Sequence, residues 1–246
     1  MVNSIIDGFN EYFEIVPAIS EELKIEAYKL RYQVYCLETD FENIDQYPEK
    51  LEFDEFDKQS VHCLIYHRKQ EIYVATTRLI LPDRDNPDKL FPIEIHSTID
   101  NLDAMKHVSR THLAEASRFC VSKAFRRRKN EINLITGTGY DMGDVFTREE
   151  RRVMPHITLG LIAGLIKMSH ENDIDNWYAV MEPALIRNFS TLGINFISLG
   201  PLVNYHGKRQ PCTIRLNDLL DGVAHKNLSH WNMLTNKGRF WKTDAD

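Results

Sequence analysis

The chain has 246 residues, of which 43% are hydrophobic and 27% are charged, and its formal net charge is −6. This length and composition are typical of a soluble globular protein that buries one sizeable core. The acidic balance argues against nucleic acid as the main partner, because phosphate binding needs a basic face that releases counterions. We therefore expect one domain and no nucleic-acid partner.

The four cysteines lie far apart in the sequence, and no two of them form a C-x-x-C pair. Neither a metal site nor a disulfide framework is indicated, so we expect reduced and mostly buried thiols. The N-terminus shows no basic segment before an apolar run, and hence no secretory signal. We expect a cytoplasmic protein.

The longest apolar segment, 153–168, is interrupted by His156, Thr158 and Lys167. It is shorter than the roughly 20 residues that span a bilayer, so it predicts a buried helix. A peripheral membrane contact stays open.

The first predicted element in chain order is a helix capped by Ser20. Its apolar positions are spaced by three or four residues and form one face, as expected for a helix. These positions are Leu23, Ala27, Leu30, Val34 and Leu37. Arg31 and Tyr35 are four residues apart beside this stripe and reach the same neighbouring space. A surface ion pair with Glu26, or with acids near Glu38, is the alternative for Arg31.

Residues 38–57 form an acidic stretch broken by Pro48, which predicts a long loop. Most charges in such a run simply face solvent. Asp54 and Asp57, however, alternate with Phe53 and Phe56. An acid pair bordered by aromatic residues indicates a loop that closes over a cation.

Residues 61–68 and 71–81 are rich in β-branched and aromatic residues, and Lys69-Gln70 separates them, which predicts a β-hairpin. Arg78 shares a strand face with apolar neighbours, so its guanidinium needs a carboxylate from the protein or from a substrate. After this hairpin we expect a loop with short structured pieces up to residue 103.

The stretch 114–121 is an apolar strand pattern that contains Glu115, Ser117 and Arg118. Burying a carboxylate or a guanidinium without a partner costs several kcal/mol, roughly, so these groups form an ion pair or bind a ligand. An edge strand whose polar residues face water is the alternative. Strand alternation places Arg118 on the face opposite Glu115 and Ser117, so all three can serve one site only if a bulge shifts the register.

The remaining elements follow from the same signals. The basic cluster 123–130 either binds a phosphate or an acidic partner, or faces solvent as a loop. The later predictions are a polar segment at 140–152, a helix from Val153, a strand at 177–181, a helix from Pro183 to Gly193, a strand at 195–200 and a short helix within 216–246.

Four motifs, taken in order, resemble those of the acyl-homoserine-lactone synthases. They are Arg31-Tyr32-Gln33-Val34-Tyr35, Asp54-Glu55-Phe56-Asp57, Thr77-Arg78-Leu79 and Glu115-Ala116-Ser117-Arg118-Phe119. The resemblance covers about residues 20 to 200 and implies the GNAT (GCN5-related N-acetyltransferase) fold. We therefore expect an α/β protein of the α+β three-layer kind, with a mixed, mostly antiparallel twisted sheet flanked by helices. One GNAT-like domain would cover 1–246, with its core at about 20–215 and a C-terminal extension at 216–246.

Two features depart from the lactone synthases. The aromatic residue near Phe41 is normally tryptophan in that family. The segment 200–211, preceded by Met181-Glu182-Pro183-Ala184-Leu185, is more similar to the acyltransferases associated with PEP-CTERM/exosortase systems, which are relatives of the long-chain N-acyl amino acid synthases.

The resemblance implies transfer of a fatty acyl group from a thioester to the α-amine of an amino acid. Acyl carrier protein, or coenzyme A, would present the acyl-phosphopantetheine thioester as co-substrate, with no tightly bound cofactor and no metal. No G-x-G pyrophosphate loop follows 114–121, which argues against ordinary use of acetyl-CoA.

The resemblance also assigns roles to residues. Glu115, directly or through a water, would be the general base, because an ammonium must lose a proton before it attacks. Ser117 and Arg118 complete the catalytic set, and backbone N–H groups along 115–121 would hold the oxyanion. The implied substrate-binding residues are Arg31, Tyr35, Phe41, Asp54, Asp57 and Arg78. The residues implied to face the acyl donor or its carrier are Phe119, Val121, Arg126, Arg127 and Arg128.

Two alternative functions stay open. One is an acyl-homoserine-lactone (autoinducer) synthase that uses S-adenosylmethionine, which Asp54 and Asp57 favour. The other is a non-catalytic GNAT-like module that binds an acyl ligand and would not need Glu115.

Overall fold

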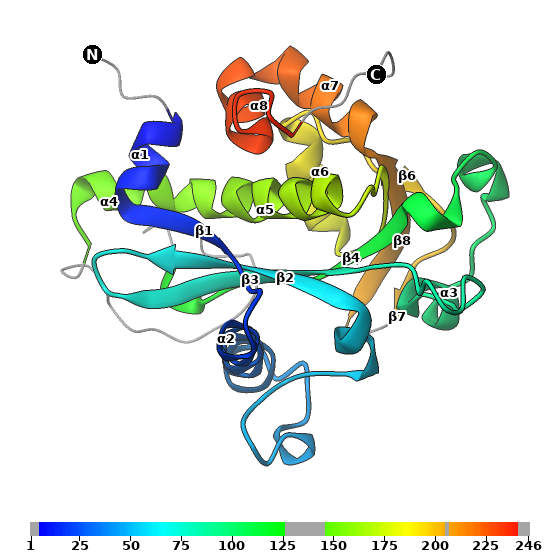
Figure 1. Ribbon diagram of the computed structural model, residues 1–246, viewed down its shortest axis with the longest axis horizontal. Coiled ribbons are helices and arrows are strands. Elements are labelled where there is room, and N and C mark those ends of the chain that lie inside the picture. Colours follow the sequence, from blue (N-terminus) through cyan, green and yellow to red (C-terminus); the bar gives the residue numbers. More distant parts are fainter. Residues whose placement is uncertain (1–4, 126–145, 205–206, 241–246) are drawn as a thin grey trace. The chain divides into compact units, whose positions relative to one another are not determined.

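The computed structural model describes residues 5–125, 146–204 and 207–240, and Figure 1 labels its elements. In chain order the helices and strands are α1 (Ile5–Tyr12), β1 (Phe13–Pro17), α2 (Glu21–Tyr32), β2 (Ser60–His67), β3 (Ile72–Ile80), α3 (Pro92–His96), β4 (Leu113–Val121), α4 (Arg148–Val153), α5 (Ile157–Glu171), β5 (Asn176–Met181), α6 (Pro183–Thr191), β6 (Ile197–Ser198), β7 (Val203–Asn204), β8 (Lys208–Arg215), α7 (Leu216–Lys226) and α8 (Leu228–Thr235).

Within the described residues the strands form one eight-stranded sheet in the order β1-β2-β3-β4-β5-β8-β6, and β7 pairs with β8. β4 and β5 run parallel, whereas β1 with β2, β5 with β8, β6 with β8 and β7 with β8 are antiparallel. The predicted mixed, mostly antiparallel sheet flanked by helices is confirmed. Because β4 lies inside this order, the edge-strand interpretation of 114–121 is wrong.

The chain folds as two compact units. The first comprises Met1–Glu55, His62–Thr77 and Arg118–Gly164, and the second comprises Phe56–Val61, Arg78–Ser117 and Leu165–Asp246. The boundaries fall inside β2, β3, β4 and α5. The expectation of one domain over 1–246 stays a prediction.

In the first unit, α2 begins where the sequence predicts. The Ser20 side chain accepts a hydrogen bond from the backbone N–H of Leu23 at 3.4 Å. The apolar stripe holds as far as Val34, but the prediction for Leu37 is wrong, because this residue is 57% exposed. A π-helix at Gln33–Glu38 continues α2, and its wider turn rotates the later side chains away from the stripe.

The sequence analysis missed α1 and β1 in this unit. The buried rings of Phe9 and Phe13 lie 5.5 Å apart, and β1 pairs with β2 from Phe13 opposite His67 to Pro17 opposite Cys63. Elements this short carry little periodic signal, so only pairing and burial reveal them.

α4 lies at the end of a segment predicted only as polar. Thr147 and Glu150 form a capping box, in which Glu150 N–H donates to Thr147 Oγ1 at 3.2 Å and Thr147 N–H donates to Glu150 Oε2 at 2.6 Å. This reciprocal cap allows a short, highly charged helix to form.

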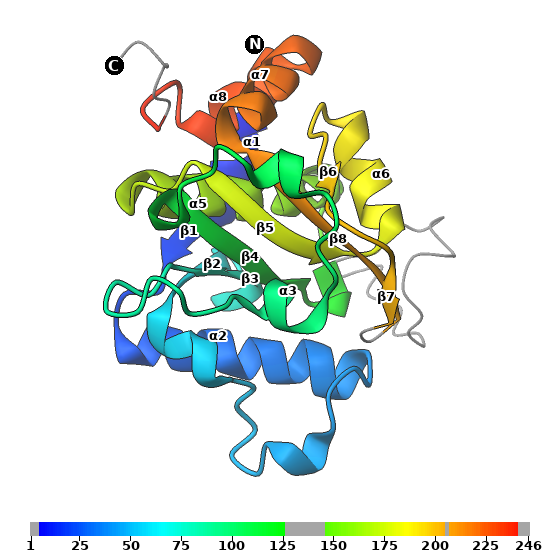
Figure 2. The same ribbon diagram turned by 90° about the vertical axis from the view of Figure 1, so that its right-hand side faces the viewer.

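In the second unit, neighbouring side chains of β5 point to opposite faces of the sheet, as strand geometry requires. Trp177 Nε1–H donates to Ser169 Oγ of α5 at 2.8 Å, whereas the Tyr178 ring packs edge-on against Phe91 at 6.0 Å. α5 therefore covers one face and the segment around α3 covers the other. Figure 2 shows α7 and α8 above β5 and β8, and α3 below them.

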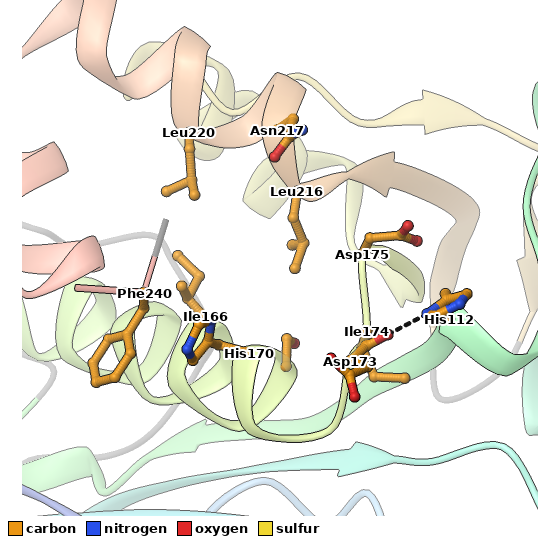
Figure 3. A pocket seen from close by; sticks show the side chains of 11 residues that line it. His112, Ile166, His170, Asp173, Ile174, Asp175, Leu216, Asn217, Leu220 and Phe240 are labelled. Carbon is orange, nitrogen blue, oxygen red and sulfur yellow. Dashed lines mark hydrogen bonds between the residues drawn. The ribbon is translucent and has the colours of Figure 1, made fainter. Parts of the chain in front are cut away.

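A cavity of about 230 Å³ lies on the α5 face. The end of α5, the loop after it, the start of α7 and Phe240 line it (Figure 3). Its lining contains none of the side chains to which the sequence analysis gave a functional role.

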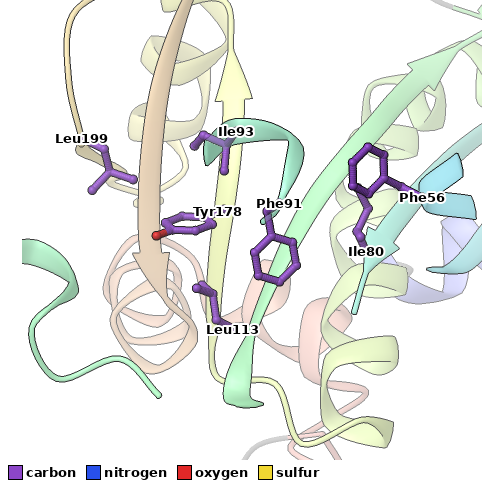
Figure 4. Packing of buried hydrophobic residues seen from close by; sticks show 7 residues of the cluster. All are labelled: Phe56, Ile80, Phe91, Ile93, Leu113, Tyr178 and Leu199. Carbon is purple, nitrogen blue, oxygen red and sulfur yellow. The ribbon is translucent and has the colours of Figure 1, made fainter. Parts of the chain in front are cut away.

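The opposite face holds the apolar cluster shown in Figure 4, whose buried members are Phe56, Ile80, Phe91, Ile93, Leu113, Tyr178 and Leu199. This cluster joins α3 to β4 and β5. α3 thus sits against the strand that carries Glu115.

The later elements agree only in part with the sequence predictions. β5 and α6 form at the predicted places, but the strand predicted at 195–200 is only Ile197–Ser198. β8 was missed, because polar residues and Pro211 hide its pattern. The tail predicted to carry one short helix forms two, α7 and α8. Leu219, Val223 and Leu234 are buried, whereas Leu228 at the start of α8 is 63% exposed.

The described residues contain no helix that is long and apolar enough to cross a membrane. All four cysteines are described and buried, and they form no disulfide with one another.

The packing of α1 on α5 yields a stability prediction. A Cβ atom added at Gly160 would lie 2.6 Å from Cζ of the buried Phe9 ring and 3.3 Å from Ile65 Cδ1, whereas one added at Gly8 meets only Val153 Cγ2 at 3.7 Å. We expect Gly160→Ala to lower the free energy of unfolding by about 1 to 3 kcal/mol through overpacking. Gly8→Ala should be neutral or stabilise by up to about 1 kcal/mol, because alanine loses less backbone entropy. Urea unfolding of both variants measures this; equal effects would contradict the packing.

Candidate active site

The backbone of β4 is interrupted at Arg118, whose φ of +50° lies in the left-handed region. A non-glycine residue seldom adopts this conformation inside a strand, and doing so breaks the regular alternation of side chains. Consecutive residues therefore need not point to opposite faces here. Ser117 and Arg118 each enter a polar cluster, one in each unit.

The cluster of the first unit is built around the buried carboxylate of Glu52. Arg31 Nε–H donates to Glu52 Oε2, and both side chains are fully buried. Arg118 donates to Glu52 Oε1 through Nε–H at 3.0 Å and through an Nη2–H at 2.9 Å. The same Nη2 group donates to Asp54 Oδ2 at 3.0 Å. Two guanidinium groups thus face two carboxylates, and their formal charges cancel.

The electrostatics of this cluster follow from its burial. Burial alone would raise the pKa of Glu52, but the charges of Arg31 and Arg118 lower it to about 2. Burial would also lower the pKa of Arg118, and Glu52 together with Asp54 raises it well above the usual range. Glu52 and Arg118 therefore stay charged at neutral pH.

Two aromatic residues border Arg118. The Tyr35 and Phe41 rings are stacked 6.5 Å apart, and the Arg118 guanidinium lies 5.8 Å from the centre of the Tyr35 ring. The backbone N–H of Phe41 donates to the Tyr35 carbonyl at 2.8 Å, just beyond the π-helix. Burial raises the pKa of Tyr35, so its phenol stays protonated. The wider π-helical turn brings these two rings together.

In the second unit, Arg78 forms a separate cluster. Its Nη1 group lies 3.1 Å from Asp57 Oδ1, and both side chains are almost completely buried. Arg78 Nε–H also donates to Ser117 Oγ at 3.0 Å. Asp57 thus supplies a carboxylate for Arg78 from within the protein.

Glu115 lies in the second unit, on the α3 face of β4. It is 4% exposed, and its Oε2 accepts the backbone N–H of Ile93 at 2.9 Å. In the parallel pairing with β5 it stands opposite Tyr178. Burial, with a smaller effect of Glu94, raises the pKa of Tyr178 to about 12, so this phenol is also neutral.

The pairing of β4 with β5 is short. It covers Leu113–Glu115 against Asn176–Tyr178, while β5 continues its pairing with β8 as far as Met181. β4 therefore leaves β5 directly after Glu115.

The structure distributes the expected site residues between the two units. The first unit holds, together with Glu52, the residues Arg31, Tyr35, Phe41, Asp54 and Arg118, and the second unit holds Asp57, Arg78, Ser117 and Glu115. Phe119 and Val121 are half-buried on β4. The expected donor-binding residues Arg126, Arg127 and Arg128 lie outside the described residues, so their role stays a prediction.

The sequence analysis missed Glu52. It is one of nine acids within 38–57, and nothing in the local pattern separates it from those that face solvent. The sequence analysis did single out the adjacent residues Phe53 and Asp54. The expectation that this loop closes over a cation is met by the protein's own arginines, because Asp54 contacts Arg118 and Asp57 contacts Arg78.

A protein-family model described as "Acetyltransferase (GNAT) domain" matches residues 30–135. A search of the curated proteins finds no significant match. Among solved structures, that of the AHL synthase LasI aligns with a TM-score of 0.54 and 17% identity, over 86% of this chain and 96% of that chain. The chain has the GNAT fold.

Two further solved structures share this GNAT fold. BjaI, a CoA-dependent acyl-homoserine lactone synthase with SAM and isopentyl-CoA, aligns with a TM-score of 0.53 and 15% identity, over 93% of this chain and 89% of that chain. FeeM, an N-acyl amino acid synthase from uncultured soil microbes, aligns with a TM-score of 0.50 and 12% identity, over 87% and 96%. The domain match and the GNAT fold together support an acyltransferase.

The Glu52 cluster yields a pH-dependent prediction. The pKa of Glu52 falls from an ordinary 4.5 to about 2 in the folded protein, which corresponds to on the order of 3 kcal/mol of stability above pH 4.5. This contribution is lost as the pH falls from 4.5 toward 2. We expect Glu52→Gln to destabilise strongly at pH 7, where two arginines lose their partner, and much less near pH 2.

Urea unfolding at several pH values measures this effect. Glu49→Gln is the matched control, because Glu49 is an exposed acid of the same loop. A Glu52→Gln penalty that does not change between pH 7 and pH 2 would contradict the assignment.

Proposed function

We propose that this protein is an N-acyltransferase that moves a fatty acyl group from a thioester to the α-amine of an amino acid. The observation that carries the proposal is the buried carboxylate of Glu115 at the point where β4 leaves β5. The GNAT fold, which the N-acyl amino acid synthase FeeM and the CoA-dependent lactone synthase BjaI share, supports the reaction class.

In the proposed reaction Glu115 removes a proton from the acceptor ammonium, directly or through one water. The amine nitrogen then attacks the thioester carbonyl carbon, and its electron pair forms the new C–N bond. The tetrahedral intermediate collapses, the C–S bond breaks, and the cationic nitrogen gives up a second proton, which the departing thiolate takes up. Glu115 then releases its proton to solvent. Backbone N–H groups after Glu115 are suited to stabilise the oxyanion, because β4 no longer pairs with β5 there.

The two arginine clusters differ in what they offer a substrate. The Arg31 and Arg78 side chains are almost completely buried beside Glu52 and Asp57, which suits a role in holding the local structure. Arg118 is 17% exposed and borders the Tyr35 ring. We propose Arg118, with Tyr35 and Phe41 beside it, as a guanidinium of the first unit that can bind a carboxylate.

The proposal also covers the acyl donor and the group of acyltransferases to which this protein is most similar. We propose acyl carrier protein as the donor's carrier, with acyl-CoA as the alternative that BjaI illustrates. The similarity to exosortase-associated acyltransferases rests on 200–211. Part of this segment forms the β7–β8 hairpin, in which Val203 pairs with Arg209 and Asn204 pairs with Lys208.

Glu115→Gln tests the base directly. We expect kcat to fall about 10²-fold or more while the affinity for the donor is kept, because only proton removal is lost. Mass spectrometry of the N-acyl product, with a panel of acyl-carrier and acyl-CoA donors, measures the rate. Glu171→Gln, at a surface ion pair with Lys167, is the control. Wild-type rates in Glu115→Gln would remove Glu115 from the mechanism.

The acceptor is tested by separate incubations with each amino acid and with S-adenosylmethionine. We expect an acylated amino acid, because Phe41 replaces the tryptophan of the lactone synthases and 200–211 adds material that they lack. A lactone together with methylthioadenosine would identify the lactone-synthase alternative instead. Donor binding without any product would identify the non-catalytic module.

A further inference from the structure

Arg110 lies in the short turn before β4 and holds the loop that precedes α3. Its Nε–H donates to the carbonyl of Pro87 at 2.9 Å, and an Nη2–H donates to the carbonyl of Lys89. Its Nη1 and Nη2 groups donate to the two carboxylate oxygens of Glu94 at 2.6 and 2.8 Å. One guanidinium thus fixes two backbone positions and one side chain.

Glu94 connects this guanidinium to α3. Its Oε2 also accepts the backbone N–H of Phe91 at 2.8 Å, which caps the start of the helix. The Arg110 guanidinium lies 4.9 Å from the centre of the Phe91 ring, and Phe91 packs edge-on against Tyr178 (Figure 4). Arg110 therefore constrains α3 both through Glu94 and through Phe91.

α3 in turn contacts Glu115. The backbone N–H of Ile93, one residue before Glu94, donates to Glu115 Oε2 at 2.9 Å. This hydrogen bond sets the orientation of the carboxylate and favours its charged form. The charged or titratable groups on the surrounding elements include Glu94 and His96 on α3, Arg110 and His112 in the turn, and Tyr178 on β5.

We propose that Arg110 and Glu94 are positioning residues for the acyl-transfer base: they hold α3 so that the Ile93 N–H stays on Glu115 Oε2. This inference rests on the proposed function, because it assigns the pair a role through Glu115. The side chains of this ion pair are 28% and 14% exposed, and a partly exposed pair contributes little to stability. Loss of this ion pair should therefore leave the protein folded, but the Glu115 carboxylate would no longer be held in its orientation.

The experiment compares Arg110→Ala and Glu94→Gln with the wild type in the acyl-transfer assay. We expect kcat to fall about 10-fold or more, with the KM for the donor within about twofold, because a misplaced base slows only the chemical step. The acidic limb of the pH–kcat profile should move to higher pH, since the hydrogen bond that favours the carboxylate is weakened. Arg110→Lys should be more active than Arg110→Ala but less active than the wild type, because lysine keeps the charge but cannot make the bidentate contact with Glu94.

Arg84→Ala is the control, since Arg84 is an exposed arginine of the same loop.

A double variant tests whether Arg110 acts on the reaction through Glu115. If Arg110 acts through Glu115, Arg110→Ala should cost little further rate in a Glu115→Gln background.

The outcomes distinguish failure of the positioning role from failure of the proposed function. A slow Glu115→Gln enzyme combined with an unshifted pH profile in both Arg110→Ala and Glu94→Gln would overturn the positioning role and leave the proposed function standing. Wild-type rates in Glu115→Gln would overturn the proposed base, and the positioning role with it. If Arg110→Ala does not fold, the isosteric Glu94→Gln decides on the same readouts.

Discussion

The left-handed backbone of Arg118 is the constraint on which the polar architecture depends. In a regular strand the side chains of consecutive residues alternate strictly between the two faces of the sheet. The φ of +50° at Arg118 interrupts this alternation, and Ser117 lies beside Arg78 while Arg118 lies beside Glu52 and Asp54. Such a residue costs of order 1 kcal/mol or more and persists only where its surroundings hold it. Here four hydrogen bonds from the Arg118 guanidinium to the carboxylates of Glu52 and Asp54 hold it.

Each of the two units also neutralises its buried charges with its own side chains. Arg31 and Glu52 are fully buried, as Arg78 and Asp57 nearly are. A buried ion pair adds little net stability, but losing one partner leaves an uncompensated charge that costs about 3 to 5 kcal/mol. These pairs therefore specify the path of residues 52–57 rather than simply strengthening the fold. The Arg110–Glu94 pair differs, because it is partly exposed, and the contacts of Arg110 fix the loop that precedes α3.

Local patterns were sufficient where one element carries its own signal. The Ser20 cap, the β2–β3 hairpin, β4, β5 and the Pro183 helix start could all be predicted, because helix and strand periodicities are properties of adjacent residues. They were insufficient for β1 and β8, which are short or mixed in polarity and are recognised only by the strands they pair with. The π-helix at Gln33–Glu38 was equally hidden, because the apolar spacing before it is that of an ordinary α-helix.

For the candidate site, the order of the motifs was enough to place Glu115, Ser117 and Arg118 on one strand and to require a break in its regularity. The choice of partners needed the tertiary structure. Nine acids occupy the loop 38–57, and only the folded path of that loop makes Glu52 the carboxylate between Arg31 and Arg118. The contact of Ile93 with Glu115 likewise joins residues 22 positions apart. Charge and spacing are local, whereas burial, and with it the strength of every such pair, depends on distant segments that exclude water.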